Sequence, residues 1–89
     1  MDYIVNKNGT QIMIESQALD LKKQIAEQYK TVRISKRLSQ EKAADAAGMA
    51  RPDVSRFESG KYNPSLELMI RYAQALNCDL KIELVPRKK

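Results

Sequence analysis

Four residues that start or stop helices divide the middle of the chain into short segments. Ser39 offers a side-chain oxygen as an N-cap for a helix over residues 40–47, and Gly48 stands where a left-handed residue closes such a helix. Gly60 and Ser65 then mark the end of the next helix and the start of another. The spacing predicts two helices of about two turns each that meet across a tight turn, followed by a loop and a further helix.

A longer helix is predicted before these segments, over residues 17–36. Leu21, Ile25, Tyr29 and Val32 fall in one narrow stripe of its surface at spacings of four, four and three. Such a stripe is typical of a helix that turns one face to a hydrophobic core. We therefore expect this helix to support the shorter ones.

The helix after Ser65 is predicted to run to about Leu76, with Asn77 as its left-handed end. Its expected core stripe comprises Leu66, Met69, Ile70, Ala73 and Leu76. A second apolar flank comprises Leu68, Tyr72 and Ala75, and this flank requires cover from outside the helix.

Residues 80–85 alternate between apolar and polar side chains before Pro86, which predicts one strand. A lone strand cannot satisfy its own backbone, so it pairs either with N-terminal strands or with a second copy of itself. We favour the second copy, because antiparallel pairing across a two-fold axis also covers the apolar flank. The sequence thus predicts a homodimer whose interface comprises Leu68, Tyr72, Leu80, Ile82 and Leu84.

The first sixteen residues allow two interpretations. Tyr3–Val5 and Gln11–Ile14 flank Asn8-Gly9, which suits the two-residue turn of a hairpin. The alternative is a frayed lead-in, since an isolated two-stranded hairpin is marginally stable in water. The expected organisation is an arm or hairpin over 1–16, a helical domain over 17–78, and a dimerisation strand with a basic tail over 79–89.

Charge and residue types limit the functions open to this chain. Its 89 residues hold one domain with a net charge of +5, and residues 30–61 alone contain eight basic and four acidic side chains. An acidic partner such as nucleic acid fits this clustering, although a solvated basic face is the alternative. There is no His and one Cys, so neither a zinc cluster nor a His-based triad can form within the chain. We expect no catalytic residue, metal or cofactor.

The chain also lacks the signals of membrane insertion and export. No apolar stretch approaches the roughly 20 residues that span a bilayer, and no basic segment followed by an apolar one opens the sequence. We therefore expect a soluble cytoplasmic protein without a membrane partner.

The runs Leu38–Ala44, Gly48-Met49, Val54–Lys61 and Asn63–Leu66 carry several different structural signals in one register. Together, within about residues 28–80, they closely resemble the Cro/cI-repressor (Xre) family of helix-turn-helix proteins. The resemblance implies a mainly α, lambda-repressor-like bundle of four to five helices, to which we add the short C-terminal strand and the N-terminal hairpin. It also implies that the helix after Gly48 lies in the major groove of double-stranded DNA.

The resemblance assigns DNA contacts to two sets of residues. The base-facing positions are Arg51, Pro52, Ser55 and Arg56, and the phosphate-contacting positions are Ser39, Gln40, Ser59, Lys61 and Asn63. An Arg in the first set can bond to O6 and N7 of guanine, with phosphate contact as the alternative. Pro52 contacts a thymine methyl group or stiffens the first turn, and Gln40 alternatively caps its helix. The family pattern further implies a partly buried structural pair between Arg33 and Glu58.

The flanks of the domain look like those of HigA- or HipB-type antitoxins, because a compact domain leads directly into one short strand without an effector-binding domain. We interpret the protein as a bacterial, nucleoid-associated repressor that binds an inverted-repeat operator as a homodimer. It would autoregulate its operon as the antitoxin of a type II toxin–antitoxin pair, with a toxin protein as partner. The alternatives are a stand-alone regulator and a protein-interaction adaptor on the same scaffold. An enzyme is disfavoured, since no activated nucleophile with its base is visible.

Overall fold

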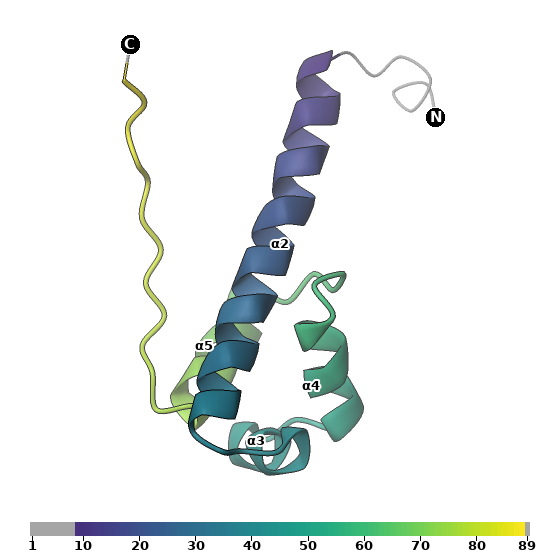
Figure 1. Cartoon of the computed structure of the whole chain (residues 1–89), viewed down its shortest axis with the longest axis vertical. Helices are drawn as coiled ribbons and strands as arrows, with labels where there is room; N and C mark the ends of the chain where they lie inside the picture. The colour runs from purple at the N-terminus through teal and green to yellow at the C-terminus, as the bar shows by residue number, and fades with distance from the viewer. Residues whose placement is uncertain (1–8, 89) are drawn as a thin grey trace.

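The computed structural model describes residues 9–88, which form four α-helices joined by short turns (Figure 1). The helices are α2 (Gly9–Ser35), α3 (Gln40–Ala47), α4 (Arg51–Glu58) and α5 (Leu66–Ala75). The three short helices gather around the C-terminal half of the long α2 (Figure 1). The expected mainly α, helix-turn-helix class is confirmed.

The predicted caps set the ends of the short helices. The Ser39 hydroxyl oxygen accepts a hydrogen bond from the Lys42 amide at 3.0 Å, and Ser65 accepts one from Leu68 at the same distance. Gly48 has a φ of 67° and closes α3 in the left-handed conformation that glycine adopts without steric cost. The tight turn between α3 and α4 therefore follows from local sequence.

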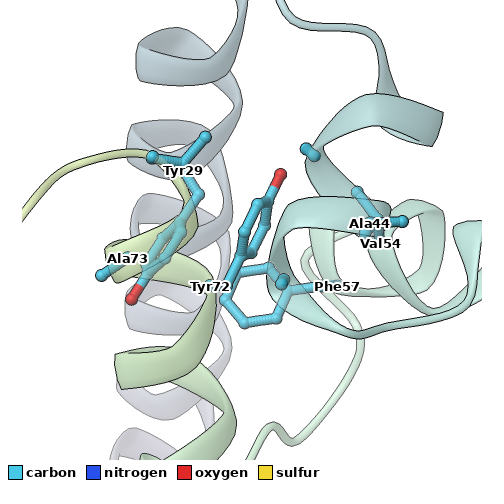
Figure 2. Close-up of a cluster of buried hydrophobic side chains, with 9 residues drawn as sticks. Tyr29, Ala44, Val54, Phe57, Tyr72 and Ala73 are labelled. Atoms are coloured by element: carbon cyan, nitrogen blue, oxygen red, sulfur yellow. The ribbon is translucent and has the colours of Figure 1, made fainter.

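An aromatic triad joins three of the helices at the centre of the core (Figure 2). The rings of Tyr29 from α2, Phe57 from α4 and Tyr72 from α5 lie 4.7 to 5.2 Å apart between centroids. Two of the three contacts are edge-on, the geometry that aromatic pairs prefer. The Tyr29 hydroxyl also donates to the Met69 carbonyl at 2.7 Å, which links α2 to α5.

Small residues form the buried face of α3. Ala43, Ala44 and Ala47 are all buried in the same cluster as the aromatic triad and Val54. Alanine side chains let α3 approach α4 and α5 closely, and the large rings from the other helices supply the volume that the alanines lack. Met49 and Met69 pack against the edge of this cluster.

The prediction of an N-terminal hairpin is wrong for the residues that the structure describes. Gln11–Ile14, its expected second strand, lies within α2, and Tyr3–Val5 lies outside the described residues. The helix also begins well before residue 17. Once α2 is nucleated by its packed half, each added residue gains a backbone hydrogen bond without a new nucleation cost, whereas an uncovered hairpin is marginal.

The C-terminal strand does not form within the described part of this chain. Residues 79–88 leave α5 as an extended segment that runs toward the end of the molecule where α2 begins, without a strand partner (Figure 1). Those candidates for pairing that fall within residues 9–88 are helical, so this part of the chain offers residues 80–85 no edge to join.

The predicted faces of α5 are also wrong in part. Tyr72 is fully buried and therefore cannot contribute to a dimer interface, while Leu66 and Ile70, expected in the core, are 54% and 43% exposed. The buried face is centred on Tyr72, Ala73 and Leu76. This face takes Tyr72 from the predicted flank and Ala73 and Leu76 from the predicted core stripe, and the contacts of Tyr72 that turn it inward are described below.

Candidate nucleic-acid interface

Helix α4 has one face in the core and one face in solvent. Val54 and Phe57 are buried, whereas the four predicted base-facing side chains are exposed, namely Arg51, Pro52, Ser55 and Arg56. Pro52 lies in the first turn, where its missing N–H has no helical partner to lose. The buried face of α4 thus anchors the helix in the core, and the opposite face presents cationic and hydroxyl groups to solvent.

A carboxylate at the end of α4 fixes this helix to the other three. Glu58 accepts hydrogen bonds from Arg33 Nε at 2.7 Å and Nη2 at 3.0 Å, from the Tyr72 hydroxyl at 2.6 Å, and from Gln40 Nε2 at 3.3 Å. Its side chain is only 3% exposed and that of Arg33 only 10%. We call Glu58, Arg33, Gln40 and Tyr72 the Glu58 network. The expected structural pair is present, and α3 and α5 each add a further donor.

The network keeps the Glu58 carboxyl ionised. Burial by itself would raise its pKa, but the hydrogen bonds from Arg33, Tyr72 and Gln40 outweigh that cost and hold the pKa below its ordinary value of 4.5. Burial and the bond to Glu58 raise the pKa of the Tyr72 hydroxyl, which therefore remains a donor. All members have the protonation states that the hydrogen bonds require.

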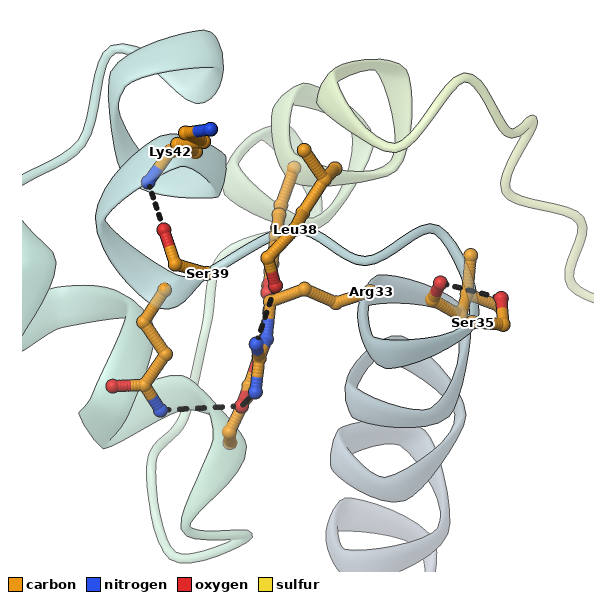
Figure 3. A network of polar contacts seen from close by, with 9 residues as sticks. Arg33, Ser35, Leu38, Ser39 and Lys42 are labelled. Carbon is orange, nitrogen blue, oxygen red and sulfur yellow. Dashed lines mark hydrogen bonds and ion pairs between the residues drawn. The ribbon is translucent and has the colours of Figure 1, made fainter.

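Arg33 also organises the entry into α3. Its Nη1 donates to the Leu38 carbonyl at 2.7 Å, directly before the Ser39 cap (Figure 3). Between them Arg37 adopts a φ of 58°, a conformation in which glycine is favoured. The bond from Arg33 to the Leu38 carbonyl stabilises the turn in this conformation.

Arg56 lies at the edge of the exposed face with two neighbours that the sequence did not predict. Its Nη1 lies 3.2 Å from Asp53 Oδ1, and its guanidinium carbon lies 5.9 Å from the centre of the Tyr62 ring. Both side chains of the ion pair are about half exposed, so water screens the attraction strongly. The contacts orient Arg56 without removing it from solvent.

The predicted phosphate-contacting residues surround the ends of α3 and α4 and differ in the hydrogen bonds they already make. Ser39 accepts a bond and retains its hydroxyl proton, and Gln40 uses one N–H for Glu58 while its amide carries two. Ser59 donates to the Arg56 carbonyl at 2.6 Å, so its proton is already engaged. Lys61 and Asn63 are exposed in the loop after α4. Ser59 is accordingly the least suited of the set to donate to a phosphate.

Sequence reasoning missed Tyr72, Asp53 and Tyr62 as participants in the site. No spacing rule links Tyr72 to Glu58, because they lie on different helices fourteen residues apart. Asp53 and Arg56, in contrast, stand three positions apart on one helix, a spacing that predicts contact.

Two short helices joined by a tight turn, the second exposing a basic face, define a helix-turn-helix unit. A family model described as helix-turn-helix matches residues 30–82, more than half of the chain. The chain belongs to this family, of the Xre/Cro type, and is a DNA-binding transcription regulator whose partner is double-stranded DNA. Neither the comparison with curated proteins nor the comparison with solved structures gave a match. Within residues 9–88, no helix combines the length and the apolar character needed to cross a bilayer.

Replacing Glu58 with alanine is expected to lower the free energy of unfolding by about 3–5 kcal/mol, because Arg33 would remain as a buried unpaired charge. DNA affinity should fall with it, since α4 loses its attachment to α2, α3 and α5. Thermal unfolding and operator titration measure the two effects. Glu67→Ala is the matched control: its exposed pair with Arg71 spans 3.9 Å, and its loss should change stability by no more than about 0.5 kcal/mol. Unchanged melting of Glu58→Ala would contradict the structural role.

The same network predicts a pH dependence that separates Glu58 from other carboxylates. Its folded-state pKa is depressed, so its stabilisation is complete above 4.5, the ordinary value, and is lost as the pH falls through the folded-state value. Glu58→Gln should therefore show a shallower loss of stability below that pH than the original chain. Equal slopes would argue against the network.

Proposed function

We propose that the protein is a sequence-specific repressor that binds an inverted-repeat operator as a two-fold dimer and excludes competing proteins from that site. The exposed face of α4, held in place by the Glu58 network, is the observation that carries this proposal. A recognition helix must project side chains into the major groove from a rigid support, and α4 combines both properties.

Base recognition is assigned to Arg51, Ser55, Arg56 and Pro52. Each guanidinium can donate two bonds to the O6 and N7 acceptors of guanine, and the Ser55 hydroxyl can serve any base pair. Arg56 has to exchange Asp53 for a base edge, so Asp53 keeps the guanidinium positioned until DNA arrives. Pro52 supplies an apolar contact for a thymine methyl group.

Phosphate contact is assigned to Ser39, Gln40, Lys61 and Asn63, with Ser59 in a weaker role. Gln40 both braces Glu58 and offers its second N–H outward, so a phosphate bond there would couple backbone binding to the position of α4.

The dimer is supported by apolar side chains that the described chain leaves uncovered. Ile82 and Leu84 are 69% and 99% exposed, and Leu80 and Leu68 are half-buried. Such a segment is stabilised by pairing with another chain. A symmetric pair also matches the symmetry of an inverted repeat, with half-sites about 34 Å apart.

Binding to the DNA upstream of its own gene tests the proposal. If each protomer neutralises three or four phosphates, log affinity should fall with log salt at a slope of about −5 to −7 for the dimer. Gel-shift titrations at several salt concentrations give the slope, with a scrambled duplex as the control. A slope near zero would remove the electrostatic basis of the proposal.

Two variants separate base recognition from phosphate contact. Arg56→Ala should relax base preference at one position of each half-site, at about 1–3 kcal/mol per lost guanine contact. Lys61→Ala should weaken all sequences about equally and lower the salt slope by about 1 per protomer. Arg71→Ala, a change of equal charge on α5, is the control. The reverse pattern would show that the two roles are exchanged.

We further propose that the regulator is the antitoxin of a type II toxin–antitoxin pair. Ile12 and Leu19 are exposed on one side of α2, and Ile14 and Leu21 are exposed on another, which supports a protein partner in addition to a second copy. Co-expression with the product of the adjacent gene tests this: that product alone should arrest growth, and the antitoxin should relieve the arrest and co-purify with it. A harmless neighbouring product would favour the stand-alone regulator.

A further inference from the structure

The N-terminal half of α2 extends beyond the bundle and buries little apolar surface of its own. Ile12, Ile14, Leu19 and Leu21 are between 43% and 55% exposed, and the short helices do not reach this part of α2 (Figure 1). The backbone of this projection continues a helix that is nucleated by its packed half, so it forms without a second nucleation step, but its apolar side chains remain in water. No other element of the described chain covers these apolar side chains.

Three apolar residues on this projection form a continuous line with Ile25, which is half-buried at the edge of the core. Ile14, Ala18, Leu21 and Ile25 are spaced by four, three and four residues, the a/d spacing of paired helices. At 100° per residue they fall within an arc of about 60°. We call these four residues the α2 ribbon. Leu19 is equally exposed but lies about 140° from Ile14, on the other side of the helix.

The α2 ribbon leads into a groove beside the bundle. Gln28 and Val32 continue the a/d spacing and line this groove together with Leu76 and Leu80. The ribbon and the groove therefore form one surface along α2, long enough to accept a helix over several turns.

The charged residues beside the ribbon indicate which partner it binds. Glu15 is exposed and negative, with a hydrogen bond from Gln11 at 3.5 Å along the same helix, and Lys22 lies seven residues further on the same edge of the ribbon. We infer that the ribbon binds the ribbon of a second copy in antiparallel orientation. This inference rests on the proposed dimer and assigns its main contact to α2.

In this arrangement Ile14 meets Ile25 of the second copy and Ala18 meets Leu21, so a small residue faces a large one in the central layers. Glu15 lies opposite Lys22 of the second copy, and the two-fold axis repeats that attraction. A parallel pair would set Thr10 against Glu15 and Gln17 against Lys22, with no opposite charges adjacent. Charge complementarity therefore favours the antiparallel pair.

The arrangement also suits an operator with adjacent major grooves. Helix α4 packs beside α2 between Lys23, which lies next to Gly60, and Arg33, which binds Glu58. At 1.5 Å per residue, the two copies of Lys23 would be offset by about 10 Å along the helices and the two copies of Arg33 by about 40 Å. The spacing of about 34 Å between successive major grooves on one side of the duplex lies within this range.

Charge reversal tests the antiparallel register directly. Glu15→Lys and Lys22→Glu should each raise the dimer dissociation constant about tenfold or more, because each creates two like-charge contacts. An equimolar mixture of the two variants should form a heterodimer, in which both contacts are attractive again. Sedimentation of the full-length variants, alone and mixed, measures this, and circular dichroism confirms that each remains helical.

Matched controls lie on the same helix away from the ribbon. Asp20→Lys and Lys30→Glu make the same charge changes at exposed positions and should leave the dimer constant within about twofold, mixed or separate. Leu21→Gln should weaken the dimer about tenfold or more, whereas Leu19→Gln, of similar exposure, should not.

Single reversals that leave the dimer unchanged, or a mixture that shows no preferential heterodimer, would overturn the inference. Operator titration of the same variants distinguishes a wrong dimer interface from a wrong proposed function. If either single-reversal variant still binds the operator as a dimer, the function is retained and the interface is a different one. If the original chain binds no operator, the proposed function itself is wrong.

Discussion

The position of α4 depends on one buried carboxylate. Glu58 is the last residue of α4, and its two oxygens accept bonds from Arg33 on α2, Gln40 on α3 and Tyr72 on α5. A hydrophobic core of this size orients helices only loosely, because apolar contacts are not directional. Bonds from three helices to one charged group are directional, and each lost donor leaves the carboxylate less compensated. The network thus converts a small core into a rigid support for an exposed basic face.

The same network explains which face of α5 is buried. The buried face combines Tyr72 from one predicted apolar stripe with Ala73 and Leu76 from the other. Turning Tyr72 inward brings its hydroxyl to Glu58 while its ring packs against Tyr29 and Phe57. Leu66 and Ile70 consequently turn to solvent. The alanines of α3 make this packing possible, because small side chains leave space for three aromatic rings.

Local signals predicted most of the fold and part of the site. The caps at Ser39 and Ser65, the left-handed residues Gly48 and Asn77 and the exposed face of α4 follow from residue types at fixed offsets. The pair between Arg33 and Glu58 came from the family pattern, since no local rule links them. The choice of α5 face and the third and fourth members of the network depend on contacts between distant helices, which periodicity does not encode. The hairpin prediction was wrong because it relied on local propensity. Ile12 to Ile14 have strand propensity, but a helix already nucleated at Tyr29 extends through them.

Helix α2 has two parts with different sources of stability. Its C-terminal half contributes Tyr29 and Arg33 to the core and the Glu58 network, so the folded domain fixes its direction. Its N-terminal half is continuous with that half and therefore points where the domain directs it, with its apolar residues exposed. A contact made by the ribbon would for this reason be transmitted along a rigid helix to the support of α4. The spacing between two recognition helices would then depend on helix geometry and on the Glu58 network, with no flexible linker between the dimer contact and the DNA contact.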